Sequence, residues 1–464
     1  MVDWIPDELG APLTGRGGWT YAGNSLTSAT QIKSVSYAPF SAGAKVLAID
    51  QQPKLWDVVA ATSITGTPTI PAGPPAYHRG KLIIPNNDGT TAVTYYDGTT
   101  LGNLAGSPPA GQLAAVYKDH AILAKSSANK NRVWFSAAGD PTTWDTSNGY
   151  WDTTGDVTAI GTLLNAILIY HDDSIERLRG TTPPPGSDMV LEPLFDYGCI
   201  DPFSVCFWRN RLIHASAEGI YMTDGASDLD LTSAAQMKTY WQSTLAGYSS
   251  LWRIAAGIYR DHYIISINNG STLVDCFCID LMRRTMYRMT NLHGSAFAQV
   301  SSKAQEELYM GQWNAGRVAK VSTLWSPSAS VKQDGDGTNP APVLETAMIR
   351  GWDRLHRRWI QSMGKQKWRW TYADYDLRDA ATDNPTIALS FATTPTGSYT
   401  AMSHQSTLAE TTDYSRIRCS PSATPGGAVR TNMYGVKVAV TGPYASAKLF
   451  ALEQVFEPIE VGQL

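Results

Sequence analysis

The sequence predicts an all-β protein that consists of a β-propeller of about seven blades followed by a C-terminal β-sandwich. Three observations lead to this fold class: the composition, a repeat in the middle of the chain, and alternating strands in its last third. The 464 residues are 43% hydrophobic and only 17% charged, and they include 39 Gly, 26 Pro, 15 Trp and 22 Tyr. Turn formers and aromatic strand formers in such numbers are typical of many short strands.

Residues 1–30 are expected to form an extended N-terminal arm. The first fifteen residues carry acidic side chains and no apolar segment, so we expect no signal peptide. No apolar run anywhere in the chain approaches the length of a membrane span, so we expect no membrane insertion.

Residues 31–325 are expected to form the propeller, because a repeat recurs there every 40 to 52 residues. Most copies open with an aromatic residue, continue with a polar turn, and then enter an apolar strand. Five copies are clear: YHRGKLIIP from Tyr77, YKDHAILAK from Tyr117, TLLNAILIY from Thr162, FWRNRLIHA from Phe207 and YRDHYIISI from Tyr259. Weaker units at 34–70 and 296–325 bring the blade count to seven, with six and eight as alternatives. A single blade cannot bury both faces of its sheet, so the blades must stack and close into a ring.

The stretch NRVWFSAAGDPTTWDT at 131–146 is similar to the Asp-box hairpin of sialidase propellers. Its acid follows Gly139, as Asp140, whereas the Asp-box acid precedes the glycine. We therefore expect a scaffold hairpin across which Trp144 packs, and not a catalytic element.

The remaining elements follow in order along the chain. A short helix is predicted at 232–244, between two blades. The Ser/Gly/Pro/Asp-rich run at 326–342 predicts a linker, and strands separated by Gly/Pro/Ser turns at 343–464 predict the β-sandwich.

A basic strip lies near the start of the sandwich, between residues 350 and 370. Its basic residues face a single acid, Asp353, in a chain whose net charge is −4. The strip consists of Arg350, Arg354, Arg357, Arg358, Lys365, Lys367 and Arg369. Interleaved Trp residues leave three interpretations open: a solvated strand face, an interface with an acidic protein, or a DNA contact.

The sequence contains no pattern that indicates catalysis, a cofactor or a metal. The eight histidines fall at different offsets of the repeat, and we expect most of them on the surface or in turns. Cys276 and Cys278 are expected to be small apolar strand residues, since no second pair has zinc-like spacing. The five scattered cysteines fit a reducing compartment such as a cytoplasm. The cluster HDDSIE at 171–176 offers carboxylates for glycoside hydrolysis, although Asp in a blade turn ordinarily caps backbone groups.

Several motifs together resemble the β-propeller tail hub, or nozzle, proteins of tailed bacteriophages, of the packaged-DNA stabilisation type. The similar stretches are NRVWFSAAGDPTTWDT at 131–146, SDLDLTSAAQMKTYWQST at 227–244, RIRCS at 416–420, YGVKVAVTGPYASAKLFALEQVFE at 434–457 and RGGWTYAGNSL at 16–26. The resemblance implies a virion protein assembled in the bacterial host cytoplasm as a ring, expected to be a hexamer. Such a ring extends the DNA channel below the portal and adaptor, helps to retain the packaged genome, and gives other tail components such as a fibre or needle a docking platform. It implies no catalytic residue and no sequence-specific binding of the viral DNA.

The basic strip departs from the motifs of this family, which leaves its docking partner open. Three other classes also remain open: a minor tail-tip protein of a long-tailed phage, a glycan-binding propeller (lectin or glycosidase), and a cellular propeller scaffold. A lectin or glycosidase would place a carboxylate and an aromatic residue at the same offset in several blades, and the sequence contains no such recurrence.

Overall fold

Seven antiparallel sheets of the described residues form the blades of a propeller, and three further sheets belong to a separate C-terminal unit. This computed structural model describes residues 4–6, 13–15, 18–26, 31–184, 186–235, 237–246, 253–269, 273–301, 306–325, 343–345, 349–350, 352–353, 358–359, 366–376, 386–392, 399–402, 415–419, 429–431, 433–441 and 448–457. The predicted linker at 326–342 lies outside these residues. The sequence therefore predicted the fold class correctly, and the blade count is seven.

Blades 1 to 4 each follow the chain from the first strand to the last. Blade 1 contains β4 (Ile32–Phe40), β5 (Gly43–Asp50), β6 (Leu55–Asp57) and β7 (Thr62–Ile64). Blade 2 contains β8 (Ala76–His78), β9 (Lys81–Ile84), β10 (Thr94–Tyr96) and β11 (Leu101–Asn103). Blade 3 contains β12 (Leu113–Tyr117), β13 (His120–Ala124), β14 (Arg132–Ala137), β15 (Asp140–Trp144) and β16 (Tyr150–Asp152). Blade 4 contains β17 (Ala159–Thr162), β18 (Ala166–Tyr170), β19 (Ile175–Arg179) and β20 (Val190–Phe195).

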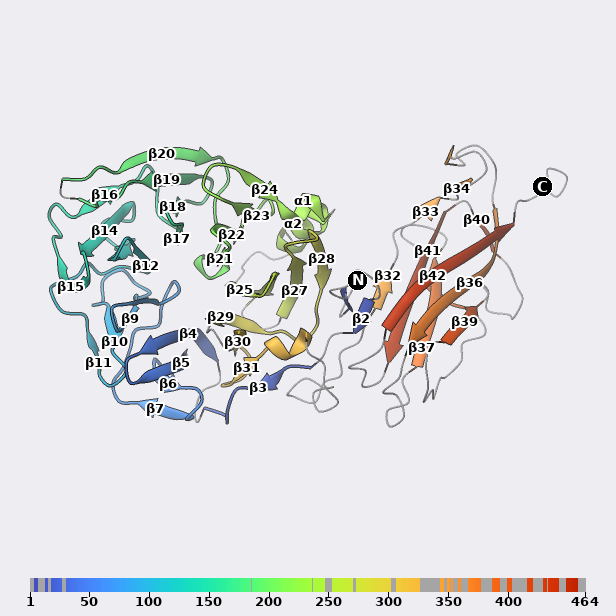
Figure 1. The fold of residues 1–464 in the computed structure, drawn as a ribbon, viewed down its shortest axis with the longest axis horizontal. Coiled ribbons are helices and arrows are strands. Elements are labelled where there is room, and N and C mark those ends of the chain that lie inside the picture. Colours follow the sequence, from blue (N-terminus) through green and yellow to red (C-terminus); the bar gives the residue numbers. More distant parts are fainter. Residues whose placement is uncertain are drawn as a thin grey trace. The chain divides into compact units, whose positions relative to one another are not determined.

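Blades 5 to 7 complete the ring (Figure 1). Blade 5 contains β21 (Cys206–Trp208), β22 (Arg211–Ala215), β23 (Ile220–Thr223) and β24 (Asp228–Asp230). Blade 6 contains β25 (Arg253–Tyr259), β26 (His262–Asn268), β27 (Leu273–Asp280) and β28 (Thr285–Arg288). Blade 7 contains β29 (Gly294–Ser301), β30 (Glu306–Gln312), β31 (Val318–Lys320) and, from the N-terminal region, β3 (Thr20–Tyr21).

The first strand of each blade lies innermost, and first strands of neighbouring blades contact one another. These contacts link β8 to β12, β17, β21, β25 and β29 in succession, and β29 closes the ring against β4. The inner strands are rich in small residues because space is limited near the axis. At Gly257 in β25, an added Cβ would lie 2.6 Å from the Cβ of Phe297 in β29, so a side chain at this position would force the two strands apart.

The outer edge of blade 7 is completed by a segment from the N-terminal region. β3 lies beside β31, and the chain after it continues along blade 7: Ala22 N donates to Val318 O at 2.9 Å, and Leu26 N donates to Gly316 O at 3.0 Å. Residues 1–30 were expected to be an extended arm. Their described part contains three short strands, of which β1 (Trp4–Pro6) and β2 (Leu13–Gly15) belong to the C-terminal unit. Strands of two or three residues are too short to show a periodic pattern in the sequence. Their stability comes from pairing with the edge of an existing sheet.

The stretch at 131–146 forms the predicted hairpin, from β14 to β15. The Asp140 carboxylate accepts from Thr142 N at 2.9 Å and from the Thr142 and Thr143 hydroxyls, and these donors lower its pKa to about 2. Trp144 packs against the buried cluster shared by blades 2 and 3, which includes Ile83 and Leu123. Its Nε1 donates to Pro141 O at 2.8 Å.

The helix predicted at 232–244 is present as two short helices, α1 (Leu231–Ala234) and α2 (Lys238–Ala246). The Asp230 side chain caps α1 by accepting from Ser233 N. Trp241 is fully buried in the core of blades 5 and 6, and its Nε1 donates to Ser216 O at 3.0 Å. Two short 3-10 helices, η1 (Pro202–Ser204) and η2 (Ser322–Trp325), follow blades 4 and 7. Within the described residues no helix has the length and apolar character needed to span a membrane.

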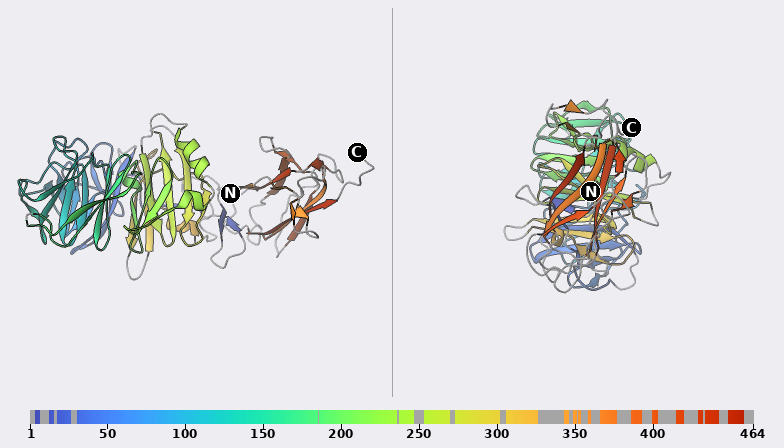
Figure 2. Two further views of the ribbon diagram at one scale, coloured as in Figure 1. Left: turned by 90° about the horizontal axis from the view of Figure 1, so that it is seen from above. Right: turned by 90° about the vertical axis from the view of Figure 1, so that its right-hand side faces the viewer.

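The C-terminal unit is a β-sandwich of two main sheets, as predicted, and its strands form two layers in Figure 2. One sheet has the order β1, β2, β42 (Lys448–Glu457), β36 (Gln366–Asp376) and β39 (Ser415–Cys419), with β40 (Val429–Thr431) also paired to β36. The other has the order β32 (Val343–Glu345), β41 (Met433–Thr441), β37 (Thr386–Ala392) and β38 (Thr400–Ala401), with β33 (Ile349–Arg350) also paired to β41. Leu389 opposite Val438 and Phe391 opposite Val436 form buried cross-strand pairs, as expected for the inner face of a sandwich. β34 (Trp352–Asp353) and β35 (Arg358–Trp359) form a separate two-stranded sheet.

Candidate functional site

The predicted basic strip is distributed over three sheets of the C-terminal unit. Arg350 ends β33, opposite Met433, whereas Arg358 begins β35, opposite Asp353. Lys367 and Arg369 lie on β36, where Lys367 pairs with Arg430 on one side and Glu457 on the other. Arg354, Arg357 and Lys365 lie outside the described residues. That the strip is a protein interface stays a prediction.

In each blade, the turn between the first two strands lies beside the neighbouring blade and contacts it. We call them the rim turns, at residues 41–42, 79–80, 118–119, 163–165, 209–210 and 260–261. Several are two-residue turns with positive φ at both positions, such as Lys118 (46°) with Asp119 (65°) and Arg209 (46°) with Asn210 (59°). Such turns match the twist of a hairpin and explain the polar residues of the sequence repeat.

Residues in and beside the rim turns form a series of contacts from blade 1 to blade 7. Tyr77 Oη donates to Pro39 O at 2.8 Å, Arg79 Nε to Asp119 Oδ1 at 2.8 Å, and Lys118 Nζ to Asn165 Oδ1 at 3.4 Å. The series continues with Leu164 N to Asn210 Oδ1 at 3.2 Å, Arg209 Nη2 to Asp261 Oδ1 at 2.9 Å, and Arg260 N to Glu306 Oε1 at 2.9 Å. The polar residues of the repeat are therefore engaged in joining blades.

Carboxylates do recur at one offset of the repeat, and they cap turns. Asp57, Asp97, Asp224 and Asp280 each stand at the end of the third strand of a blade. Their Oδ1 atoms accept from backbone N–H groups two or three residues later, as with Thr100 N to Asp97 at 2.7 Å. This is the Asx-turn role that favours Asp at such positions.

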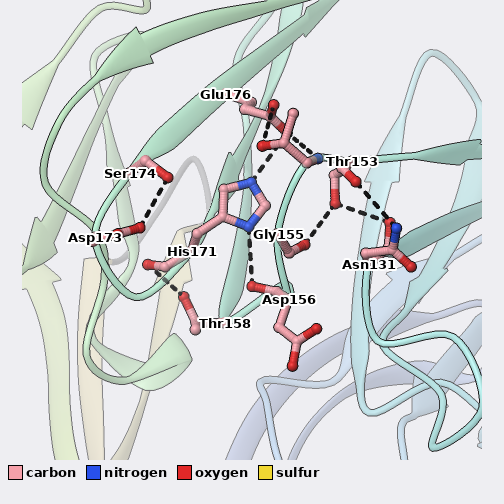
Figure 3. Close-up of polar contacts among 10 residues, drawn as sticks. Asn131, Thr153, Gly155, Asp156, Thr158, His171, Asp173, Ser174 and Glu176 are labelled. Atoms are coloured by element: carbon pink, nitrogen blue, oxygen red, sulfur yellow. Dashed lines mark hydrogen bonds and ion pairs between the residues drawn. The ribbon is translucent and has the colours of Figure 1, made fainter.

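The HDDSIE cluster contains a buried histidine–carboxylate pair that joins blades 3 and 4 (Figure 3). The side chains of His171 and Glu176 are 3% and 5% exposed, and His171 Nε2 lies 3.1 Å from Glu176 Oε2. His171 Nδ1 donates to Asp156 O at 3.0 Å, and the Thr154 hydroxyl donates to Glu176 Oε1 at 2.8 Å. Asp156 and Thr154 follow blade 3, whereas His171 and Glu176 belong to blade 4.

This geometry provides a joint between blades 3 and 4. The second carboxylates of the cluster, Asp172 and Asp173, are exposed on the turn, and Asp173 accepts from the Ser174 hydroxyl at 3.2 Å. Glu176 is directed inward, and its oxygens are occupied by His171 and Thr154. Most histidines were expected on the surface or in turns. The side chain of His171, which directly follows the buried strand β18, is buried and therefore requires hydrogen-bond partners.

Arg253 forms a second buried joint, at the start of β25. Its Nη1 donates to Lys33 O at 3.3 Å and to Ser295 O at 3.2 Å, and its guanidinium lies 3.8 Å from the centroid of the Phe203 ring. Its Nε lies 3.7 Å from Asp201 Oδ2. These partners come from the inner strands of blades 1 and 7 and from the segment between blades 4 and 5. Arg253 therefore connects both sides of the ring closure to the blades before it.

Burial shifts the ionisation of the groups around Arg253. The pKa of Asp201 is raised because its carboxyl is desolvated, although Arg253 and two backbone N–H donors act in the opposite direction. The pKa of Lys33 is lowered to about 8 by burial and by the nearby Arg253 charge. Sequence reasoning missed Arg253, because one Arg at the start of an apolar strand carries no signal of its partners.

His214 and four aromatic rings from blades 4 and 5 form a cluster, of which Phe195 and Tyr197 are half-buried. Tyr197 stacks on Tyr221 with centroids 3.8 Å apart, and the His214 ring lies 4.7 Å from that of Tyr170. Phe195 extends the stack beyond Tyr197. His214 is fully buried, and burial lowers its pKa to about 3. This histidine was also expected to be a surface or turn residue, whereas it lies within the buried strand β22.

We expect His214 to make the propeller sensitive to acid. Between pH 6.5 and about 3 the unfolded chain binds a proton at His214 and the folded chain does not. The free energy of unfolding therefore decreases by about 1.4 kcal/mol for each unit by which the pH is lowered in this range. His214→Phe keeps an aromatic ring in the stack and removes the titration. The free energy of unfolding, measured in urea at several pH values, should therefore fall less steeply for His214→Phe below pH 6.5. Equal slopes for both proteins would contradict this assignment.

The described residues contain no group of three or more His, Cys, Asp or Glu side chains placed to hold a metal ion. Burial raises the pKa of the Cys199 and Cys206 thiols to about 12, so both remain protonated at neutral pH. The structure describes Cys276, Phe277 and Cys278 as fully buried on β27.

The fold is thus that of a seven-bladed β-propeller with a β-sandwich unit. No protein-family model and no curated protein matches the sequence. Solved structures similar to it include the extracellular domain of a putative hybrid two-component system from B. thetaiotaomicron, with 10% identity, 92% of this chain and 62% of that chain covered, and a TM-score of 0.45. YCF48 from Cyanidioschyzon merolae has 11% identity, coverage of 65% and 98%, and a TM-score of 0.41. The N-terminal domain of Nup159 has 8% identity, coverage of 69% and 98%, and a TM-score of 0.39. At such low identity and TM-scores, we draw no functional conclusion from these structures.

Proposed function

We propose that this chain is a structural subunit of a bacteriophage tail hub or nozzle. It assembles as a ring, expected to be hexameric, below the portal and adaptor, and it helps to retain the packaged genome. Other tail components, such as a fibre or needle, dock on it. The observation that carries the proposal is the use of the propeller's polar side chains: rim turns, turn-capping aspartates and buried ion pairs hold the blades together. Together with the sequence resemblance, this supports a rigid scaffold as the function.

Electrostatics supports the proposed passage of DNA. The chain has a net charge of −4 although the basic strip concentrates positive charge in the C-terminal unit. A propeller with excess negative charge repels the DNA backbone, which allows DNA to slide past without sticking. The basic strip then remains for an acidic surface of a neighbouring subunit, in a heterologous interface that closes a ring.

Neutralising the basic strip is expected to weaken the ring. In a variant with Arg354→Gln, Arg357→Gln, Arg358→Gln and Lys367→Gln, native mass spectrometry should detect fewer oligomers and more monomer than in the unmodified chain. A control variant carries the same number of neutralised cations on exposed positions of the propeller: Lys54→Gln, Lys130→Gln, Arg211→Gln and Arg284→Gln. The interface assignment fails if both variants form the same oligomers as the unmodified chain.

The location of the protein in a particle distinguishes the hub from its alternatives. Antibody labelling of purified virions should place it between the portal and the distal tail components. Labelling at the distal end of a long tail would favour a tail-tip protein instead. Binding of the purified chain to a glycan array would favour a lectin, and absence from virions would refute both tail assignments.

A further inference from the structure

We propose that the propeller carries a docking surface for an acidic, aliphatic segment of another protein, on the rim of blades 3 to 6. This docking arc consists of Lys118, Leu164, Asn165, Val190, Phe207 and Met282. It is independent of the proposed tail function, since it follows from the exposure and charge of these side chains alone.

Exposed apolar side chains concentrate on this arc. The structure describes seven large hydrophobic side chains as exposed, and four of them belong to the arc: Leu164 (68% exposed), Met282 (59%), Phe207 (53%) and Val190 (49%). Two contacts link the turns of neighbouring blades along the arc. Leu164 N donates to Asn210 Oδ1 at 3.2 Å, and Arg209 Nη1, in the same turn, lies 3.7 Å from Met282 Sδ. Phe207 stands two residues before that turn. A cluster of this kind is typical of a protein interaction site.

A pocket opens at one end of the arc, between blades 3 and 4. Its volume is about 380 Å³, within the range of ligand-binding pockets. Its walls come from the rim turns of both blades and from the connection between β19 and β20. The lining residues are Lys118, Asn165, Arg179, Gly180, Thr181, Asp188 and Val190. Because Asn165 follows Leu164 and Val190 lines the wall, the pocket and the apolar side chains form one surface.

The pocket has an excess of positive charge, and Lys118 is its accessible cation. Within the described residues, the Lys118 ammonium contacts the Asn165 Oδ1 at 3.4 Å and lies 5.9 Å from the Tyr117 ring centroid, and no carboxylate lies within ion-pair distance of it. Arg177 and Arg179 share one carboxylate, that of Glu192, at 2.6 Å each.

The one acid in the pocket is already engaged. Asp188 accepts from Thr181 N and Oγ1 and from Thr182 N at 2.7–2.9 Å, and these donors lower its pKa. The lining thus carries two cations, Lys118 and Arg179, and one carboxylate, that of Asp188. Arg179 is paired with Glu192, so a carboxylate from outside would complete the charge balance at Lys118.

These features select the chemistry of the partner. Exposed aliphatic and aromatic side chains beside a cation can bind a partner protein, because apolar anchors supply affinity and charges set orientation. A small anion would fill the pocket and leave Leu164, Phe207 and Met282 uncovered. A segment that presents a carboxylate to Lys118 and aliphatic side chains to Leu164 and Val190 covers both parts.

The test uses the full chain and three synthetic peptides, acetyl-(Leu-Glu)4-amide, acetyl-(Leu-Gln)4-amide and acetyl-(Ser-Glu)4-amide. Binding is measured by microscale thermophoresis at low ionic strength. We expect (Leu-Glu)4 to bind most tightly, with the loss of either the carboxylates or the leucines weakening it. Lys118→Glu and Leu164→Asp should each weaken binding of (Leu-Glu)4 by about tenfold. Lys130→Glu, at an exposed position outside the arc, should leave it unchanged.

Several outcomes overturn the proposal. Equal binding of (Ser-Glu)4 and (Leu-Glu)4 would show a simple anion site, and equal binding of (Leu-Gln)4 would show that charge plays no part. No binding of any peptide, or no effect of Lys118→Glu in a variant whose circular dichroism is unchanged, would also refute it. None of these outcomes affects the virion test of the tail assignment.

Discussion

Replacing Arg253 with methionine is expected to destabilise the propeller by about 3–5 kcal/mol, since it leaves the buried Asp201 carboxylate without its cation. The side chains of Arg253 and Asp201 are 11% and 14% exposed, so solvent replaces little of what is lost. The substitution also removes the donors to the Lys33 and Ser295 carbonyl groups, where blades 1 and 7 meet. The free energy of unfolding in urea measures the effect.

Two further measurements separate this mechanism from a simple loss of packing. Without Arg253 the ionised form of Asp201 is disfavoured further, so the destabilisation should be greater at pH 8 than at pH 5. The double variant Arg253→Met with Asp201→Asn has no buried charge and should recover part of the loss. In the variant, the pKa of Lys33 should rise from about 8, because the neighbouring positive charge is gone. If the double variant is no more stable than Arg253→Met, the ion pair is not the cause.

Glu176→Ala is expected to have the second-largest effect, a loss of about 3 kcal/mol, since it leaves His171 Nε2 and the Thr154 hydroxyl without their shared partner in a buried site. Thermal or urea unfolding of the variant and the unmodified chain provides the comparison. Because the pair joins blades 3 and 4, hydrogen exchange should increase in β17 and β18, near the joint, more than in blade 7.

Asp173→Ala provides the matched control. Asp173 belongs to the same cluster but is exposed, so its removal should change stability by less than about 0.5 kcal/mol. Glu176→Gln keeps an oxygen acceptor for the Thr154 hydroxyl and should fall between the two alanine variants. If Glu176→Ala is as mild as Asp173→Ala, the buried pair contributes nothing to the joint.

Local signals in the sequence predicted the local parts of the fold. The aromatic residue before most rim turns, such as Tyr117 or Tyr259, and the apolar strand after each turn located five blades directly. The polar segment around 232–244 located the helices, although the helix is broken between Ala234 and Lys238. In each case the pattern lies within ten to fifteen residues, which is the range over which periodicity and turn chemistry act.

Contacts between distant residues could not be predicted in this way. His171 and Glu176 were recognised in the sequence as part of one acidic cluster. Their partner Thr154 follows a different blade, so the sequence did not reveal the contact between them. Without that contact, a structural joint could not be distinguished from a site with exposed carboxylates. Arg253 and its partners span residues 33 to 295. The short strand β3 has only two residues, which is too short for a pattern in the sequence, and it forms by pairing with the edge strand β31. The interface role of the basic strip rests on charge alone and stays a prediction.

The closure of blade 7 by β3 has a consequence for synthesis in the cell. The ribosome makes Ala22 early, but its partner Val318 emerges only after the other six blades have been translated. Until then blade 7 is not formed and the ring of blades cannot close. The nascent chain therefore carries unpaired strand edges throughout elongation. Such late, long-range pairing slows folding and exposes a chain to aggregation. Production of this protein should therefore depend on chaperones and on growth temperature.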